Sequence, residues 1–359
     1  MQGLDDVVAA DTVLSEVDGE AGRLVIRGRS LDSLAGVERF EDVVRRLWDG
    51  FLGPLPADLS PALGAARCSA FATLADLGDL APFDTVRALI ARLPDGDGLD
   101  TALRLLAAPA VFAAAALRRR NGLAPVAPDA TLGHAADVLR MLSGAVPAAE
   151  RVAALDAYLV TVCDHGLNAS TFAARVIAST GAGLVSAALG GMGALKGPLH
   201  GGAPGPVLAM LDAIGTPENA RPWLEAALRR GDRLMGFGHR IYRVRDPRAD
   251  ALKSAARKLG AAQASPARFA LAEGVETAAL TALREHKLKR PLDVNVEFYT
   301  ALLLEALGFP SDGFTCVFAM ARMAGWIAHA REQAMTGRLI RPQSRYVGPA
   351  SRDPSRALA

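Results

Sequence analysis

An apolar repeat with a helical period dominates this sequence from residue 40 onward. Apolar side chains recur at spacings of three and four, as in helices that bury one face. Aromatic residues make up only 5% of the chain, and the Ala- and Leu-rich composition favours helices over strands. Prolines and glycines bound each segment. The predicted helices cover 40–51, 62–77, 83–93, 100–118, 132–142, 149–162, 183–195, 207–214, 221–230, 249–259, 266–286, 294–307 and 313–335, and another begins near residue 168. The fold is therefore expected to be all-α.

Strand-like sequence is confined to residues 8–27. Two short β-branched and aliphatic runs, 12–14 and 24–26, flank a turn-rich stretch at 18–22. Such a pair of runs around Asp and Gly residues predicts a short N-terminal β-hairpin.

Composition limits the class of protein. The chain has 359 residues, of which 51% are hydrophobic, enough for one large domain or two domains with a sizeable core. The net charge is only +2, and the basic residues are spread along the chain, which argues against nucleic acid as a partner. The acidic N-terminus has no apolar run, so we expect no secretory signal peptide.

The same evidence predicts a cytoplasmic protein with no membrane partner. The apolar run at 107–117 is too short to span a bilayer and ends in three arginines. Cys68, Cys163 and Cys316 lie far apart in apolar helical contexts, without the spacing of metal ligands. We expect all three cysteines to be core residues in a reducing compartment.

A loop at residues 193–205 separates two helical stretches. Its glycines and prolines surround a single histidine, His200, and Gly next to a side chain lets backbone or ligand approach closely. The loop can place the imidazole at the mouth of a cleft. The alternative is a tight connection between helices with an incidental histidine.

A polar turn at residues 164–168 carries a second histidine. His165 and Asn168 lie one helical turn apart near a helix N-terminus, which offers N–H groups and a positive dipole end to an anion. The alternative is a capped helix with a structural histidine.

Residues 236–248 place two glycines before His239 and a cluster of arginines after it. The planar guanidinium fork suits carboxylates and phosphates, so this stretch predicts an anion site. The alternative is a solvated basic loop. The arginines are Arg240, Arg243, Arg245 and Arg248.

Glu297 lies within the apolar start of a predicted helix. Burial would raise its pKa above the usual value of about 4.3 and make it a better base than a surface carboxylate. The alternative is an acid that only complements the helix dipole.

The last predicted helix carries Arg322, Gly325, Trp326 and His329 on one face, because they recur at spacings of three, four and seven. A buried arginine needs an anionic partner, either a substrate carboxylate or a protein acid. Arg341, in the basic tail, can supply another guanidinium.

Together these side chains suit proton abstraction next to a carbonyl. The carboxylate is a candidate base, and neutral imidazoles are hydrogen-bond donors. The arginines would hold a substrate with several carboxylates. The sequence contains neither metal-ligand spacing nor a Ser or Cys nucleophile motif.

Three motifs resemble those of the citrate synthase family. They are KGPLHGGA at 196–203, GFGHRIY at 236–242 followed by DPR at 246–248, and the stretch 322–329. The resemblance extends from about residue 3 to residue 342. It implies a large helical domain, formed by 1–201 and 309–359, and a smaller helical domain, 202–308, that closes over the substrates. It also implies a homodimer with no permanently bound cofactor.

The resemblance implies that the protein condenses acetyl-CoA with oxaloacetate and water to give citrate and CoA. Glu297 is then the base that removes the methyl proton, His200 donates a hydrogen bond to the forming enol, and His239 activates the oxaloacetate carbonyl. The implied oxaloacetate ligands are His165, Asn168, Arg248, Arg322 and Arg341 of the partner subunit.

The contacts with CoA are predicted only from positive charge near the motifs. The alternative for each of these side chains is a solvated surface position. The candidates are Lys196, Arg243, Arg245, Lys289 and Arg290.

The chain departs from the family pattern at the base. The usual Asn-Val-Asp reads Asn295-Val296-Glu297 here, one methylene longer, and a displacement of about 1 Å can cost on the order of a hundredfold in rate. In one reading the backbone shifts to compensate for the longer side chain, and the enzyme is active. In another the pocket accepts a bulkier donor such as propionyl-CoA, as in 2-methylcitrate synthase. In a third the chain is a weakly active or non-catalytic carboxylate-binding paralogue.

Two further differences concern regulation and the surroundings of His165. Gly166 and Leu167 follow this histidine, where many family members carry an acid directly after it. The sequence has no N-terminal extension of the kind found in the longer, NADH-regulated members, so we expect no inhibition by NADH.

Overall fold

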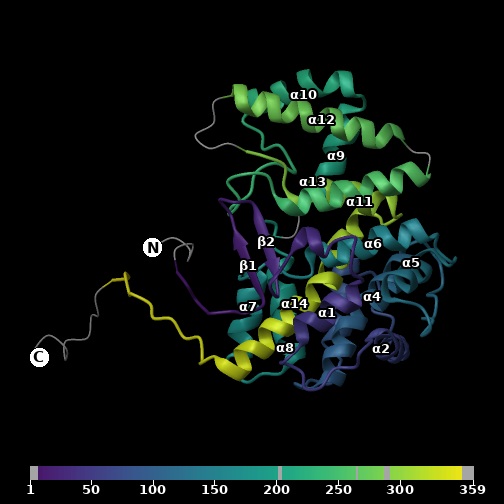
Figure 1. Cartoon of the computed structure of the whole chain (residues 1–359), viewed down its shortest axis with the longest axis vertical. Helices are drawn as coiled ribbons and strands as arrows, with labels where there is room; N and C mark the ends of the chain where they lie inside the picture. The colour runs from purple at the N-terminus through teal and green to yellow at the C-terminus, as the bar shows by residue number, and fades with distance from the viewer. Residues whose placement is uncertain (1–6, 201–203, 264–265, 287–291, 350–359) are drawn as a thin grey trace, which may run out of the picture.

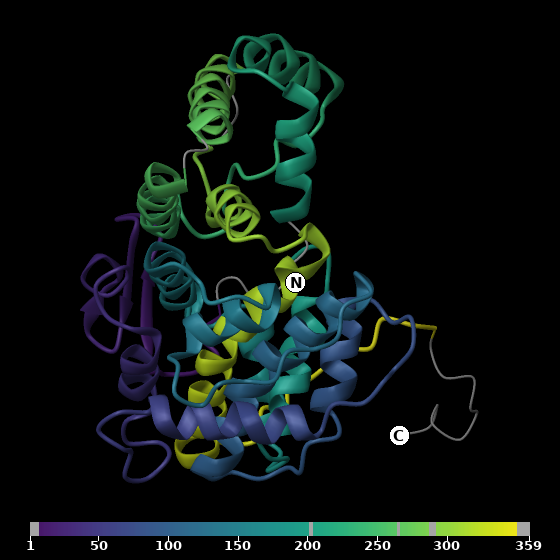
Figure 2. The same cartoon turned by 90° about the vertical axis from the view of Figure 1, so that its right-hand side faces the viewer.

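The computed structural model describes residues 7–200, 204–263, 266–286 and 292–349. Figures 1 and 2 show two tiers of helices, with α9 to α13 in the upper tier and the strands and remaining helices in the lower tier. The lower helices are α1 (Phe40–Trp48), α2 (Ser60–Ala72), α3 (Pro82–Ile90), α4 (Leu99–Arg120), α5 (His134–Ser143), α6 (Ala149–Val162), α7 (Ala169–Ala178), α8 (Leu184–Leu195) and α14 (Phe314–Thr336). The upper helices are α9 (Pro204–Ile214), α10 (Pro217–Arg230), α11 (Pro247–Gln263), α12 (Pro266–Glu285) and α13 (Val296–Ala306). Short 3-10 helices cover Leu31–Ser33 and Ser311–Gly313. The predicted all-α fold with a small β element is confirmed.

The small antiparallel sheet contains β1 (Ser15–Asp18), β2 (Arg23–Ile26) and β3 (Arg29–Ser30). The prediction of a first strand at 12–14 was wrong. Asp18 Oδ1 accepts the N–H groups of Glu20 and Ala21 within the turn, at 3.1 and 2.9 Å. This turn pairs Asp18 with Arg23, so the strand lies directly before it and 12–14 is only the lead-in.

Most helix boundaries lie within a few residues of the predictions, and the larger differences have local causes. Helix α10 begins at Pro217 rather than at 221, because proline suits the first turn of a helix. Helix α2 ends at Ala72 rather than at 77, where Thr73 bonds back to the carbonyl of Ala70 through its N–H and its hydroxyl. The apolar residues beyond Ala72 still pack on the core, but from a loop.

Helix α4 is a long helix of the lower tier whose side chains are mostly buried. Its 22 residues are long and apolar enough to cross a membrane, so the argument from a short apolar run was wrong. However, 83% of its most apolar window is buried inside the protein, as in the core helix of a globular fold. It packs against α2, α3, α5 and α14.

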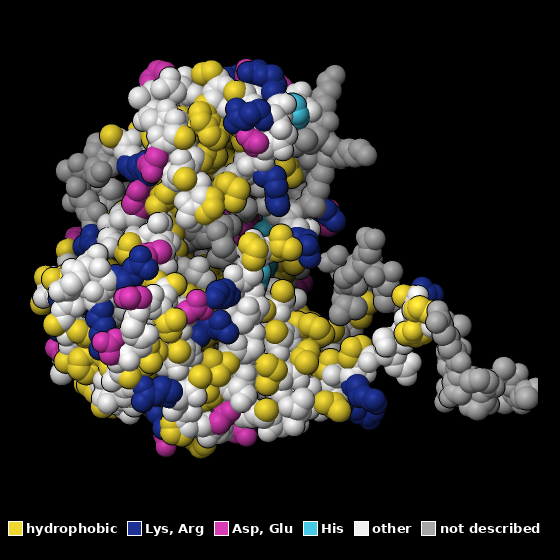
Figure 3. Space-filling model, turned by 180° about the vertical axis from the view of Figure 1, so that it is seen from behind, with side chains coloured by type: hydrophobic (Ala, Val, Ile, Leu, Met, Phe, Trp, Pro, Cys, Tyr) yellow, Lys and Arg dark blue, Asp and Glu magenta, His cyan; other side chains and the backbone are white. Residues whose placement is uncertain are grey.

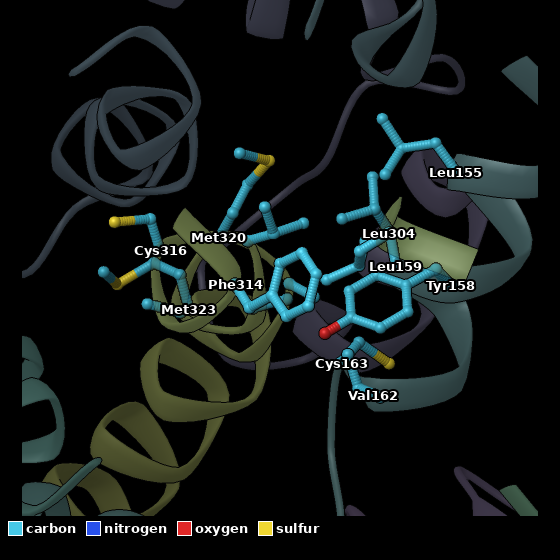
Figure 4. Close-up of a cluster of buried hydrophobic side chains, with 14 of the residues drawn as sticks. Leu155, Tyr158, Leu159, Val162, Cys163, Leu304, Phe314, Cys316, Met320 and Met323 are labelled. Atoms are coloured by element: carbon cyan, nitrogen blue, oxygen red, sulfur yellow. The ribbon is translucent and has the colours of Figure 1, made fainter. Parts of the chain in front are cut away.

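The core continues between the tiers. Figure 4 shows side chains of α6, α13 and α14 meeting there, among them Tyr158, Leu304 and Phe314. Cys163 and Cys316 are buried, as predicted. The prediction that Cys68 is a core residue was wrong, because it lies on the outward face of α2 and is exposed.

Candidate active site

Loops and helix starts from both tiers meet where the tiers join. Figure 3 shows histidine side chains at this junction, in the view from behind. Nε2 of His165, which follows α6, lies 3.1 Å from the hydroxyl of Tyr242 in the upper tier. The ring centroids of His165 and His239 are 5.8 Å apart, and those of His239 and Tyr242 are 4.8 Å apart. The structure therefore brings together two of the predicted histidines and adds a tyrosine.

Two glycines with positive φ shape the loop before His239. Gly236 and Gly238 have φ angles of +84° and +85°, a conformation that other residues rarely adopt. A Cβ on Gly236 would also lie 2.8 Å from the Phe298 side chain. The loop thus lies directly on the start of α13.

The imidazole of His239 has a defined orientation. Its Nδ1 accepts the backbone N–H groups of Ile241 and Tyr242, at 3.0 and 3.1 Å. In the neutral ring the proton is then on Nε2, which lies 3.1 Å from Nη2 of Arg248. Two N–H donors converge at this point, and an oxygen of a ligand would satisfy both.

Arg248 is held by a buried carboxylate. Its Nε and Nη2 donate to the two oxygens of Asp246, at 3.0 and 2.8 Å. Asp246 also accepts the N–H of Val296, at 3.2 Å. Asp246 therefore links Arg248 and the end of the His239 loop to the first turn of α13.

Arg322 on α14 is fully buried with spare donors. Its Nε donates to the carbonyl of Val162 at 2.8 Å, while Nη2 has no partner within the described residues. Burial, with a contribution from Arg248, lowers the pKa of Arg322 to about 10. Because an unpaired buried guanidinium N–H is costly, this side chain is poised to bind an anion.

Glu297 lies in the first turn of α13. Asn295 caps this helix, since its Oδ1 accepts the N–H of Glu297 at 3.0 Å and its Nδ2 donates to the carbonyl of Gly238 at 2.8 Å. Burial raises the pKa of Glu297 to about 7, although the charge of Arg248 opposes the shift. The carboxylate is thus a stronger base than a surface glutamate.

His200, which follows α8, faces a serine at the start of α7. Its Nε2 lies 2.8 Å from Oγ of Ser170, which also accepts Nε1–H of Trp326 at 3.2 Å. Burial lowers the pKa of His200 to about 4, and the charges of Arg322 and Arg248 add to this effect. Burial and the same arginines hold the pKa of His165 well below its usual value. Both imidazoles are therefore neutral near pH 7.

Asn168 caps α7. Its Oδ1 accepts the N–H groups of Ser170 and Thr171, each at 3.1 Å. This is the capping geometry that the sequence left open as the alternative to ligand binding. Its Nδ2 is buried and has no partner among the described residues.

His329 lies apart from the other histidines. Its Nδ1 accepts from Nη1 of Arg175 at 2.9 Å, and its Nε2 lies 3.2 Å from Oδ1 of Asp164. The side chain is fully buried in this ionic network. The shared face predicted for α14 is therefore divided between Arg322 and Trp326 at the site and His329 inside the protein.

The cations predicted from charge alone have acidic partners where they are described. Lys196 pairs with Asp84 at 2.7 Å, and Arg243 lies 3.7 Å from Glu20. Arg245 is surrounded by Asp250, Glu276 and Asp293, at 2.5, 2.6 and 3.4 Å. Lys289 and Arg290 lie outside the described residues. Arg341 is exposed and belongs to the tail after α14. This tail, yellow in Figure 1, runs outward from the helices of the lower tier.

Sequence reasoning missed Ser170, Tyr242 and Asp246. The last two lie inside a motif that had been singled out for its arginines, and an Asp directly before Pro247 at a helix start was a usable signal. For Ser170 no local signal existed. Among the described residues, no group of His, Cys, Asp and Glu side chains has the arrangement of a metal site.

Comparison with known proteins gives consistent matches over nearly the whole chain. The family described as "Citrate synthase, C-terminal domain" matches residues 3–343. A putative citrate synthase 2 of Mycobacterium tuberculosis is 40% identical over 365 residues, covering 98% of this chain and 94% of that protein. A 2-methylcitrate synthase of the same species is 38% identical, with coverages of 97% and 90%.

A solved structure is similar to this chain in its fold. It is the ternary complex of citrate synthase from Thermoplasma acidophilum with carboxymethyl coenzyme A and oxaloacetate. The TM-score is 0.83 at 27% identity, over 98% of this chain and 97% of that one.

Proposed function

Because the chain belongs to the citrate synthase family, we propose that it condenses acetyl-CoA with oxaloacetate and water to give citrate and CoA. One observation carries the proposal. A carboxylate with a pKa of about 7, Glu297, lies at a helix start beside two buried arginines and near neutral imidazoles. A base, donors for a developing oxyanion and clamps for carboxylates are the groups that this reaction requires.

Oxaloacetate binding is assigned to the two buried arginines and two histidines. Arg248 and Arg322 face its carboxylates, and the unpartnered Nη2 of Arg322 supports this role. Nε2–H of His239 donates to the keto oxygen, beside Nη2 of Arg248. His165 and Arg341 of the partner subunit complete the binding, while Asn168 supports it as the cap of α7.

Glu297 removes a proton from the methyl group of the thioester. A carboxylate is too weak a base to do this unless the enolate oxygen is stabilised as it forms. One well-placed donor typically contributes about 3 kcal/mol, or about two orders of magnitude in rate. His200 is the proposed donor.

The tautomer of His200 depends on Ser170. Two acceptors, Nε2 of His200 and Oδ1 of Asn168, each lie 2.8 Å from the Ser170 hydroxyl. The hydroxyl can donate to either acceptor, and because the Asn168 oxygen already accepts two backbone N–H groups, we propose that it donates to His200. The imidazole proton is then on Nδ1, which has no hydrogen bond within the described part of the chain and can donate to the substrate.

A carbon–carbon bond forms next. The enolate carbon attacks the keto carbon of oxaloacetate, the thioester carbonyl re-forms, and the keto π bond opens. The keto oxygen takes the proton of Nε2 of His239, and the proton that Glu297 removed restores the neutral imidazole. Water then hydrolyses the thioester of citryl-CoA, which releases citrate and the thiol of CoA. We propose that residues 202–308 form the smaller domain. Its closure over the rest of the chain would exclude bulk water while the proton is removed and the carbon–carbon bond forms.

A second candidate is 2-methylcitrate synthase, with propionyl-CoA as the donor. The 38% identity with the mycobacterial 2-methylcitrate synthase favours it, and so does Glu297 in place of aspartate. A non-catalytic carboxylate-binding protein is the third candidate and rests on Glu297 alone.

The test measures release of CoA thiol with oxaloacetate, using acetyl-CoA and propionyl-CoA in parallel. The proteins are the wild type, Glu297→Asp and Glu297→Gln. Turnover by the wild type that falls in both variants supports Glu297 as the base, and the faster donor decides between the two enzymes. Restoration of activity by Asp in a silent wild type identifies a weakened paralogue. Silence of all three proteins contradicts the proposal.

A further inference from the structure

Ser15 on β1 lies between the two residues that flank His165. Its Oγ donates to Oδ2 of Asp164 at 2.5 Å and accepts the N–H of Gly166 at 2.8 Å. A hydroxyl has one proton to give and lone pairs to accept with, so both bonds are compatible. A single side chain, about 150 positions away in the sequence, therefore binds the side chain of the residue before His165 and the backbone of the residue after it.

Strand β1 also packs on this turn. Gly166 has a φ of +57°, and a Cβ there would lie 3.3 Å from Cγ2 of Val17 and 3.8 Å from Oγ of Ser15. Residues 15 and 17 point to the same face of the strand, as the period of two requires. The hairpin thus contacts the turn through two consecutive side chains on one face.

The partner of Ser15, Asp164, belongs to a closed buried network. His329 approaches its other oxygen at 3.2 Å, and Arg175 holds His329 while donating to Glu332 at 2.6 Å. Glu332 in turn accepts the backbone N–H of Val13 at 2.9 Å. The network therefore connects the residue before β1, Val13, through side chains of α14 and α7 to Asp164, which in turn binds Ser15 on β1.

We propose that Ser15 is a positioning residue for His165, so that the N-terminal hairpin forms part of the keto-acid site. This inference rests on the proposed function, in which His165 binds oxaloacetate. The ring of His165 is buried and lies 3.1 Å from the hydroxyl of Tyr242, so a small shift of residues 164–166 changes where its N–H points. Displacements of about 1 Å at such a site can cost on the order of a hundredfold.

The test compares Ser15→Ala, Ser15→Thr and Ser15→Cys with the wild type. In Ser15→Ala we expect the KM for oxaloacetate to rise about tenfold or more, with the KM for acyl-CoA within about twofold of wild type. Ser15→Thr keeps the hydroxyl and restores the KM for oxaloacetate. Ser15→Cys is close in size but bonds weakly, so it behaves like Ala and serves if Ser15→Ala does not fold.

The matched control is Glu16→Ala, the next residue on the same strand, whose exposed side chain accepts a hydrogen bond from Arg23 of the same hairpin and lies away from the turn of His165. It leaves both KM values unchanged.

A melting temperature that falls in Ser15→Ala while the KM for oxaloacetate stays at the wild-type value overturns the inference, since Ser15 is then only structural. Calorimetric titration of the wild type with oxaloacetate separates the two proposals. If the wild type does not bind it, the proposed function fails and this inference with it. If the wild type binds it and Ser15→Ala binds equally well, only the inference fails.

Discussion

The hydroxyl oxygen of Ser170 lies 2.8 Å from Nε2 of His200 and is the side-chain hydrogen-bond partner of that imidazole within the described residues. Since the pKa of His200 is about 4 because of burial, the ring is neutral near pH 7 and only its tautomer decides which nitrogen donates. The residue that fixes the tautomer is therefore as important as the histidine.

Ser170→Ala should lower kcat about tenfold or more, with little change in the KM for oxaloacetate. Without the hydroxyl, the imidazole proton is free to sit on either nitrogen. Steady-state thiol release measures kcat. Deuterated acetyl-CoA should show a larger isotope effect in the variant, because proton removal becomes slower. An unchanged kcat with an unchanged isotope effect would contradict this role.

The rate should depend on pH through Glu297. Burial raises its pKa to about 7, so below that pH it is protonated and cannot accept the methyl proton. The value of kcat/KM for acyl-CoA should therefore rise with pH and level off above about 7. His200, with a pKa near 4, should add no titration above about pH 5. A profile that is flat from pH 5.5 to 8.5 is inconsistent with Glu297 as the base.

Asp246→Asn should weaken both stability and keto-acid binding. The buried guanidinium of Arg248 would lose its charged partner, and breaking a buried pair typically costs about 3 kcal/mol or more. Urea denaturation gives the loss of stability, and the KM for oxaloacetate gives the effect on binding. Asp84→Asn, which removes the half-exposed partner of Lys196, is the control and should change the free energy of unfolding by less than about 1 kcal/mol. Equal effects in the two variants would show that burial of the pair is irrelevant.

Subunit mixing tests the proposed role of Arg341. Arg341→Gln and Glu297→Gln should each be nearly inactive alone. If Arg341 acts in the partner's site, a hybrid dimer has one complete site, and random mixing restores about a quarter of wild-type activity. If Arg341 acts in its own subunit, or if the protein is a monomer, mixing restores none. The exposed apolar side chains of the tail, Leu339, Tyr346 and Val347, are consistent with an arm that packs on another subunit.

The helices could be predicted because a 3.6-residue period is a local property of the sequence. The first strand was misplaced because its position depends on the turn that Asp18 closes, which a run of apolar residues does not reveal. Half-buried Glu297 and buried Arg322 were also recognisable, since a charge inside an apolar helix is unusual.

Partners that are distant in the sequence could not be predicted. Lys196 and Arg245 looked like free cations, yet their acids, Asp84 and Glu276, lie on other helices. The contact between Ser15 and Asp164 could not be predicted either, because 149 positions separate the two residues in the sequence. Charge patterns identify available groups, and only the fold decides which of them remain unpaired.

The attachment of α13 has a consequence for how such a protein can diversify. Asn295 and Asp246 hold the start of this helix against the loop that carries His239 and against the residue that precedes α11, the helix of Arg248. A mutation that moved the helix toward a larger acyl donor would therefore disturb recognition of the keto acid as well. In the proposed mechanism, exchanging aspartate for glutamate at position 297 changes the reach of the base by one methylene without requiring this helix to move. Side-chain length at position 297 is thus a route by which donor choice can evolve independently of acceptor choice.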